Sequence, residues 1–255
     1  MLRRVAFLLA STAILVGACS STPSVPALTD PKAILTGSAA SLKDLKTVHF
    51  AATVDGEIKL DLGGTGTGSA IKLAGTTVEG DLDMAGKKFH AALNAPAMFG
   101  LTADLIVLDQ VTYTKVSLMS DKYQKSTSTG DSAGTGDPQK AIDELTAFLG
   151  KPEVAPVKKA DEKCGDQDCY HVSLPLTSND ISGAVGGALG SSAPSGTGTV
   201  DIWVQKNDLR PVKLVVLADG GDQGKLTVTM TLSKFNSPVT VTAPPDDQVE
   251  ASPAP

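Results

Sequence analysis

Large aromatic side chains are scarce in this chain of 255 residues. Phe, Tyr and Trp together make up 4% of it, with a single Trp, yet hydrophobic residues account for 41%. That hydrophobic fraction is enough to bury a core in a chain of this length. Much of it is Val, Leu, Ala and Ile in short alternating runs, so small aliphatic side chains rather than rings have to line the interior.

Positive charge and cysteine are also in short supply. Lys and Arg number 22 against 28 Asp and Glu, which leaves a formal net charge of −6, and there are three Cys. A nucleic-acid partner is not expected, because binding to phosphates needs a basic face. The composition likewise excludes collagen-like, coiled-coil and disulfide-scaffold classes.

The apolar run near the N-terminus is too short to span a membrane. It covers residues 5–16 and follows Arg3 and Arg4, which is the pattern of a secretory signal peptide. The run ends in Val16-Gly17-Ala18-Cys19, which resembles a bacterial lipobox. We therefore expect residues 1–18 to be removed and Cys19 to carry a diacylglyceryl group, followed by a Ser/Pro-rich flexible tether over 19–28. The alternative is an ordinary signal peptide in which Cys19 is incidental.

The two remaining cysteines are Cys164 and Cys169, separated by a Gly/Asp turn. In an exported protein such a pair is expected to form a disulfide, which in so short a loop stabilises the fold by about 2 kcal/mol. A metal site that includes His171 is the competing interpretation, but a fourth ligand is missing from the neighbouring sequence.

Helical spacing and strand alternation divide the rest of the chain into one α+β domain over residues 29–243. Asp30-Pro31 begins a helix that runs to about residue 45, and Asp137 caps a second helix that ends near residue 149. Strands are predicted at 48–54, 58–62, 70–73, 76–84, 87–93, 103–108, 111–116, 170–176, 199–204, 211–217 and 226–232. Short connections between them favour antiparallel pairing.

Two further segments complete this organisation. A third helix is predicted over 179–189, where Gly183, Gly186 and Gly187 each cost about 1 kcal/mol relative to Ala, so this helix should be marginal. Residues 244–255 are expected to form a disordered Pro/Ala tail.

The order and spacing of these elements resemble the LppX/LprG group of mycobacterial cell-envelope lipoproteins, whose fold is similar to that of the LolA/LolB lipoprotein carriers. The resemblance rests on the lipobox and on LKDLKTVHF at 42–50, VTYTK at 111–115, DP at 137–138, TVDIWV at 199–204, LRPV at 209–212 and FNSPVTVTAP at 235–244. It implies a strongly curved antiparallel half-barrel with helices over its concave face. Between the two layers it implies a hydrophobic cavity for acyl chains, whereas alternation alone would favour a closed core.

The expected cavity residues are the alternating apolar residues of the strands, which share one face of the sheet, together with the apolar residues on one side of each helix. They are Val48, Phe50, Val54, Val78, Leu82, Met84, Ile142, Leu145, Phe148, Ile181, Val185, Leu189, Val200, Ile202, Val204, Val228, Met230 and Leu232. A register slip of one residue would turn any of these strands over and move its apolar side chains to the opposite face of the sheet.

Catalytic motifs are not convincing. Ser132 lies in a G-x-S-x-G match, but in a Ser/Thr/Gly-rich stretch without the strand and helix that a nucleophile elbow requires. His49, His90 and His171 fall on the polar phases of strands, where surface residues are expected. No cofactor is predicted.

The expected function is non-enzymatic. The protein would be held on the outer face of the cell membrane by lipidated Cys19. It would carry acylated lipids or glycolipids toward the outer envelope, with a membrane exporter as a partner. A structural or interaction lipoprotein with a closed core is the main alternative, and an envelope hydrolase is a third.

Overall fold

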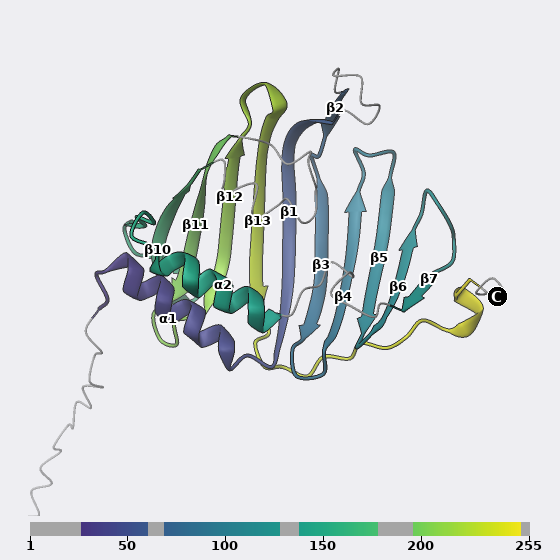
Figure 1. The fold of residues 1–255 in the computed structure, drawn as a ribbon, viewed down its shortest axis with the longest axis horizontal. Coiled ribbons are helices and arrows are strands. Elements are labelled where there is room, and N and C mark those ends of the chain that lie inside the picture. The colour runs from purple at the N-terminus through teal and green to yellow at the C-terminus, as the bar shows by residue number, and fades with distance from the viewer. Residues whose placement is uncertain (1–26, 61–68, 128–137, 178–195, 251–255) are drawn as a thin grey trace, which may run out of the picture.

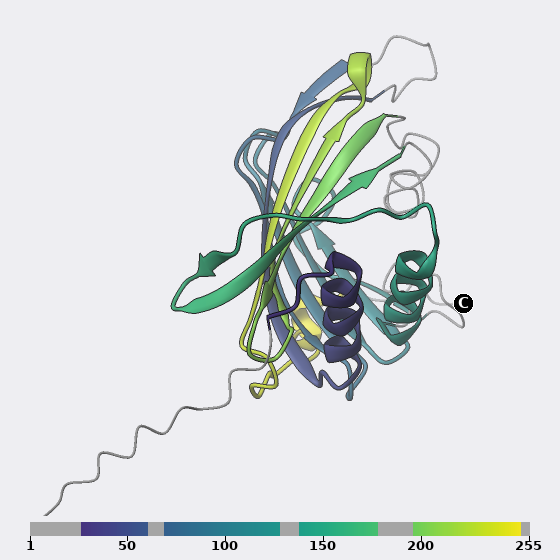
Figure 2. The same cartoon turned by 90° about the vertical axis from the view of Figure 1, so that its left-hand side faces the viewer.

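An antiparallel sheet of 13 strands forms the centre of the computed structural model, which describes residues 27–60, 69–127, 138–177 and 196–250 (Figure 1). Helices α1 (Pro31–Lys43) and α2 (Pro138–Gly150) both lie on one side of this curved sheet (Figure 2). The expected fold class is therefore confirmed: a single domain with an open, curved antiparallel sheet and few helices. None of the helices in the described ranges is long and apolar enough to cross a membrane.

The strands differ widely in length. In chain order they are β1 (Thr47–Leu60), β2 (Ser69–Lys72), β3 (Thr76–Asp83), β4 (Lys88–Ala95), β5 (Leu101–Leu108), β6 (Val111–Val116), β7 (Gln124–Thr127), β8 (Val157–Lys158), β9 (Glu162–Cys164), β10 (Gln167–Leu176), β11 (Thr197–Gln205), β12 (Pro211–Asp219) and β13 (Gly224–Ser233).

The first long strand stands in the middle of the sheet. The strand order is β7-β6-β5-β4-β3-β1-β13-β12-β11-β10-β8, with β2 paired to β1 and β9 to β10. The chain thus builds outward from β1 to β7, crosses through α2 to the opposite edge, and returns strand by strand until β13 pairs with β1. Each half is a meander of neighbouring strands, and the pairing of β1 with β13 joins them.

Local sequence explains why α1 begins where it does. The Asp30 side chain accepts a hydrogen bond of 3.0 Å from the backbone N–H of Lys32, and Pro31 occupies the first turn. The apolar residues on the buried face of α1 are Ile34, Leu35 and Ala39, none more than 3% exposed, and Ser38 is buried with them. Burial of this stripe, rather than helix propensity, fixes α1 on the sheet.

The helices run antiparallel to each other. Lys43, the last residue of α1, forms an ion pair of 2.8 Å with Asp143 in the first half of α2. At the other end, the Lys32 ammonium donates a 3.0 Å hydrogen bond to the Lys151 carbonyl just beyond α2. The main core lies between this helix pair and strands β10 and β11, and consists of Ile34, Leu35, Leu149, Val154, Tyr170, Val172, Leu174 and Val204.

Most predicted elements are present, with some corrections. The segments 48–54 and 58–62 were expected as two strands, but β1 runs continuously through Gly56 to residue 60. This is possible because Gly56 adopts φ +127° against the backbone of Lys225, where a Cβ would clash. Strands β7, β8 and β9 have no counterpart among the predicted strands. The predicted helix over 179–189 lies outside the described residues.

The C-terminal segment is more structured than expected. Residues 244–250 were assigned to a disordered tail, but Pro244 is buried and a short 3-10 helix covers Asp246–Gln248. Val249 then forms a bridge with Tyr123, and the backbone N–H groups of Tyr123 and Glu250 donate hydrogen bonds of 2.8 Å across it. The bridge and these hydrogen bonds hold the segment against the chain just before β7, so the expectation of a disordered tail is wrong for residues 244–250.

Candidate functional site

The candidate site is the face of the sheet that carries the helices, which we call the inner face. Val172 on β10 belongs to the core beneath α1, and directly opposed residues of neighbouring strands point to the same side. Following the pairing from Val172 across the sheet gives one continuous row: Ile202, Leu214, Met230, Ala52, Val78, Leu93 and Ala103. Every residue in this row is apolar, from one half of the sheet to the other.

The pairing also places the predicted strand residues. All eleven that lie within strands are on the inner face: Val48, Phe50, Val54, Val78, Leu82, Val200, Ile202, Val204, Val228, Met230 and Leu232. Met84 follows the last residue of β3.

Several inner-face residues were missing from the sequence prediction although the same alternation marks them. Leu214 and Val216 on β12 and Phe89, Ala91, Leu93, Leu105 and Val107 on β4 and β5 share the face with the predicted set. On β10 the alternating residues Tyr170, Val172, Leu174 and Leu176 face the helices. The same apolar alternation, applied to every strand, predicts these residues as well.

The helices contribute fewer of the predicted residues. On α2, Ile142 is 6% exposed, Phe148 packs against the core, and Leu149 belongs to it. The side chain of Leu145 lies outside the described part of the structure, as do Ile181, Val185 and Leu189 in full.

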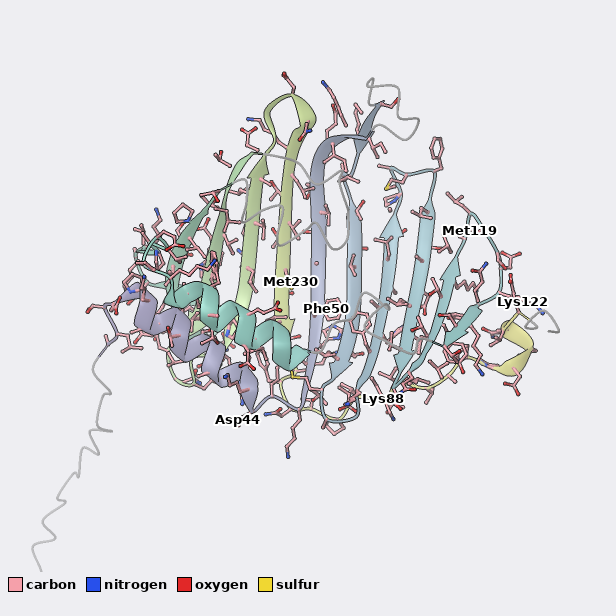
Figure 3. All side chains as sticks on the ribbon, in the orientation of Figure 1. Asp44, Phe50, Lys88, Met119, Lys122 and Met230 are labelled. Atoms are coloured by element: carbon pink, nitrogen blue, oxygen red, sulfur yellow. A yellow bond between two sulfur atoms is a disulfide. The ribbon has the colours of Figure 1, made fainter. Side chains whose placement is uncertain are left out.

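Burial changes along the inner face. Beneath the helices, Val172 and Val204 are completely buried. Phe50, Val54 and Met230, nearer the middle of the sheet, are only half-buried. Figure 3 shows Phe50 and Met230 on neighbouring strands beside the N-terminal end of α2, and Figure 1 shows both described helices over the β10–β13 half. We call the side of β13, β1, β3 and β4, where Phe50, Val54 and Met230 are half-buried, the partly open half. The division is not sharp, because Ile202 and Leu214 beneath the helices are half-buried as well, and Ala52 and Val107 on the other side are buried.

Two aromatic rings meet on this partly open half. Phe50 on β1 and Phe89 on β4 stack with their centroids 5.8 Å apart and their planes at 5°, although β3 runs between their strands. The rings can meet because Gly80 on β3 has no side chain, and a Cβ there would come within 2.7 Å of the Phe50 ring. Such a pair contributes about 0.5–1.5 kcal/mol beyond its burial and gives the face a flat aromatic area.

A pocket of about 400 Å³ opens where α2 and β10 end. Phe148, Val154 and Leu176 supply its apolar lining, and Lys151 and Glu153 supply charged groups. The first three also belong to the core or pack against it, so this pocket borders the inner face and combines an apolar wall with a polar one.

The opposite, outer face is polar, and all three histidines lie on it. His49 Nδ1 is 2.9 Å from the Asp81 carboxylate, and His90 Nε2 is 3.2 Å from that of Asp104. His171 lies between two carboxylates, at 2.9 Å from Glu162 and 3.0 Å from Asp201. These contacts give each ring a hydrogen-bond partner on the outer face, in keeping with the predicted position of the histidines on polar strand phases.

Trp203 on the outer face contacts three neighbouring side chains. Its ring stacks on His171 with centroids 4.2 Å apart, and the Lys213 ammonium lies 4.4 Å from the ring on β12. The indole N–H donates a 2.9 Å hydrogen bond to Glu162. That hydrogen bond, followed by the one to His171, outweighs slight desolvation and lowers the pKa of the Glu162 carboxyl.

The outer face also has a depression of about 460 Å³ near Tyr123, between β3 and β6. Burial, and then the charge of Asp104, raise the pKa of the Tyr123 phenol above its ordinary value, so the phenol stays protonated at neutral pH. Thr77, Asn94 and Thr102 make this lining polar, which suits it poorly to acyl chains.

The predicted disulfide between Cys164 and Cys169 is present, with the Cα atoms 5.9 Å apart across the β9–β10 hairpin. Because both thiols are consumed and His171 is bound by carboxylates, these three residues do not form the alternative metal site. Within the described ranges no group of three His, Cys, Asp or Glu is arranged to hold a metal ion. Cys19 and Ser132 lie outside those ranges.

Comparison with known proteins gives two results for the fold. LprF from Mycobacterium bovis is 19% identical, with a TM-score of 0.53 over 84% of this chain and 96% of that one. LppX from Mycobacterium tuberculosis is 15% identical, with a TM-score of 0.54 over 83% of this chain and 98% of that one. At these identities the likeness shows a shared fold.

Sequence comparison gives the family. No curated protein sequence matches the chain. A model of the LppX_LprAFG lipoprotein family, however, matches residues 30–241, which is most of the chain and all of the described sheet. The chain therefore belongs to the LppX_LprAFG lipoprotein family.

Proposed function

We propose that this lipoprotein is a carrier that holds the acyl chains of a lipid or glycolipid on its inner face. The observation that carries the proposal is the half-buried apolar surface on β1, β3, β4 and β13, next to a fully packed core on the same sheet. A soluble domain gains stability by covering such a surface, and acyl chains are the ligand that matches it in chemistry. Small aliphatic side chains leave more room above the sheet than aromatic ones would.

The proposed contacts are the inner-face residues of the partly open half. Phe50 and Phe89 offer a flat aromatic area, and Val54, Val228 and Met230 offer aliphatic surface around it. Ile142 and Phe148 of α2 form the opposite wall in this proposal. Leu145, Ile181, Val185 and Leu189 remain proposed members of the site on sequence grounds.

Energetics limit how a lipid can enter. An acyl lipid of about 30 methylenes gains roughly 25 kcal/mol on leaving water, at about 0.8 kcal/mol for each methylene. The lipid starts in a bilayer, however, where it already has that gain, so the net driving force toward the protein is close to zero. The carrier must therefore exchange its lipid while in contact with a membrane.

Membrane anchoring fits that requirement. In this proposal lipidated Cys19 holds the exported domain at the outer face of the cell membrane, and residues 20–28 let it reach lipids there. The lipid then moves toward the outer envelope, and a membrane exporter supplies it. We assign no catalytic step to the protein.

Native mass spectrometry tests the carrier proposal directly. The mature chain with Cys19→Ala is exported from a mycobacterial host behind a cleavable secretory signal and purified without detergent. We expect a stoichiometric acylated lipid in the native spectrum and in the solvent extract. A folded protein that is ligand-free and takes up no lipid from vesicles would refute the proposal and favour a structural lipoprotein with a closed core.

A matched pair of variants locates the site. Ala91 and Ala92 are adjacent on β4, with Ala91 half-buried on the inner face and Ala92 exposed on the outer face. We expect Ala91→Trp to reduce lipid occupancy at least severalfold, because the indole fills space that acyl chains would use, while Ala92→Trp leaves it unchanged. Equal occupancy in the two variants would place the lipid elsewhere.

A further inference from the structure

Two neighbouring turns project from one end of the sheet. Residues 96–100 connect β4 to β5, and residues 117–123 connect β6 to β7, at the same end because the strands alternate in direction (Figure 1). They are tied together by two hydrogen bonds of 2.9 Å, from Ser117 N–H to the Thr102 carbonyl and from Thr102 N–H to the Ser117 hydroxyl. The two turns therefore form one tip, which we define as residues 96–100 and 117–120.

The tip carries the three most exposed large apolar side chains of the described structure. Phe99 is 94% exposed, Met119 is 73% exposed and Leu118 is 62% exposed. Phe99 also has a φ of +58°, a left-handed conformation that is unfavourable for a bulky residue. Its ring gains no burial within the chain in return, so the arrangement points to a use outside the molecule.

The two turns of the tip differ in charge from the turns at the opposite end of the sheet. The tip sequences, PAMFG and SLMS, contain no charged residue. At the opposite end, the β3–β4 turn contains Lys87, the β5–β6 turn contains Asp109, and the β11–β12 turn contains Lys206, Asp208 and Arg210. Charged residues also lie beside the tip: Asp121 and Lys122 follow it directly, and the Ser120 hydroxyl donates a hydrogen bond to Glu250. The apolar character is therefore local to the two turns, and a contiguous exposed apolar patch of this kind marks a surface for interaction with a partner or a membrane.

The tip is continuous with the inner face. Leu101, which follows the first turn, pairs with Ala95 on the inner face, and Ala103 on the same strand pairs with Leu93. An apolar path thus leads from the tip to the partly open half of the sheet.

We propose that this tip inserts shallowly into the surface of a lipid bilayer, with Phe99, Leu118 and Met119 among the acyl chains nearest the headgroups. The inference rests on the proposed carrier function and adds to it the place where the protein meets the membrane. Shallow insertion would bring the open half of the inner face to the bilayer, which is where contact exchange has to occur.

Site-specific fluorescence tests insertion without requiring lipid transfer. In the Cys19→Ala chain the two remaining cysteines form the disulfide, so Phe99→Cys supplies a single free thiol for an environment-sensitive NBD label. The matched control is Val157→Cys, at a position 51% exposed on β8 at the other edge of the sheet. Phosphatidylcholine vesicles, with and without phosphatidylglycerol, should shift the emission of the label at position 99 to the blue and leave that at 157 unchanged. Equal responses at the two positions would overturn the proposal.

Transfer kinetics separate this inference from the carrier function. A variant with Phe99→Ser, Leu118→Ser and Met119→Ser should load lipid from detergent micelles as the parent chain does. It should extract fluorescent lipid from vesicles about tenfold more slowly, because membrane affinity scales with buried apolar area. Val157→Ser with Leu217→Ser, at positions 51% and 43% exposed, is the control.

Each outcome has one meaning. If the tip variant extracts lipid at the normal rate, the proposed insertion of the tip is refuted, whereas the proposed carrier function is not. A chain that binds no lipid in either assay refutes the carrier, while the fluorescence shift still decides insertion. Concentration-dependent association that the tip substitutions abolish, without any vesicle response, would assign the tip to a second copy of the chain instead.

Discussion

Ile34 offers a direct measure of what holds the helix layer on the sheet. Its side chain is 0% exposed in the core shared by α1, β10 and β11. Ile34→Ala removes three carbons, which is worth about 2.4 kcal/mol at 0.8 kcal/mol for each methylene. Incomplete collapse around the remaining space should raise the loss in unfolding free energy to about 3–4 kcal/mol.

The ion pair between the helices provides the contrast. Lys43 and Asp143 are 2.8 Å apart, but their side chains are 47% and 66% exposed. Water and salt screen such a pair, so its coupling energy should be only about 0.2–1 kcal/mol. Apolar burial, not charge, should therefore hold the two helices in place.

Urea denaturation followed by circular dichroism measures both quantities. Ile34→Ala is compared with the parent chain, and Lys43→Met, Asp143→Asn and the double variant give the coupling energy of the ion pair. The reasoning fails if Ile34→Ala costs less than about 1 kcal/mol, or if the ion-pair coupling exceeds the loss at Ile34. Either result would mean that the helices are held by charge or that α1 is not docked in solution.

Three further predictions concern single contacts. Gly80→Ala should lower the unfolding free energy by about 1–3 kcal/mol, because a Cβ at this position meets the backbone carbonyl oxygen of His90 and the Phe50 ring; thermal melting checks this, and an unchanged midpoint would contradict it. Cys164→Ser with Cys169→Ser should cost about 2 kcal/mol in urea and abolish the sensitivity of the midpoint to dithiothreitol, whereas a neutral effect would show that the hairpin tip is held by its pairing alone. At Asp161, partial burial raises the carboxyl pKa, but hydrogen bonds from two lysines outweigh it and bring the pKa below 3.8. Its stabilising contribution is therefore present above pH 3.8 and lost as the pH falls through the lower folded value; Asp161→Asn should flatten this part of the acid-unfolding curve, and an identical curve would refute the assignment.

The inner face could be predicted from sequence because strand alternation and strand pairing have the same period. Val48, Val54 and Val228 were assigned to one side from their own strands, and pairing brings them together on the inner face. The prediction missed residues such as Leu214 and Phe89, although they follow the same apolar alternation within their own strands.

Features that depend on distant partners could not be predicted from local patterns. β1 continues through Gly56 because the backbone of Lys225, far along the chain, lies against it. The contacts of the Trp203 ring likewise depend on other strands, because Glu162 comes from β9 and His171 from β10. The short strands β7 to β9 likewise have too few residues for alternation to be visible.

The central pairing of β1 with β13 has a consequence for biogenesis. Val54 pairs with Val228, so the middle of the sheet closes only when nearly the whole chain has been delivered across the membrane. Until then β1 has an open hydrogen-bonding edge beside an apolar face, which is the arrangement most prone to association with other chains. Closure of a loop this long is also slow. A chain that stopped before residue 224 would retain two meanders, each with an unsatisfied edge where the native protein has its centre.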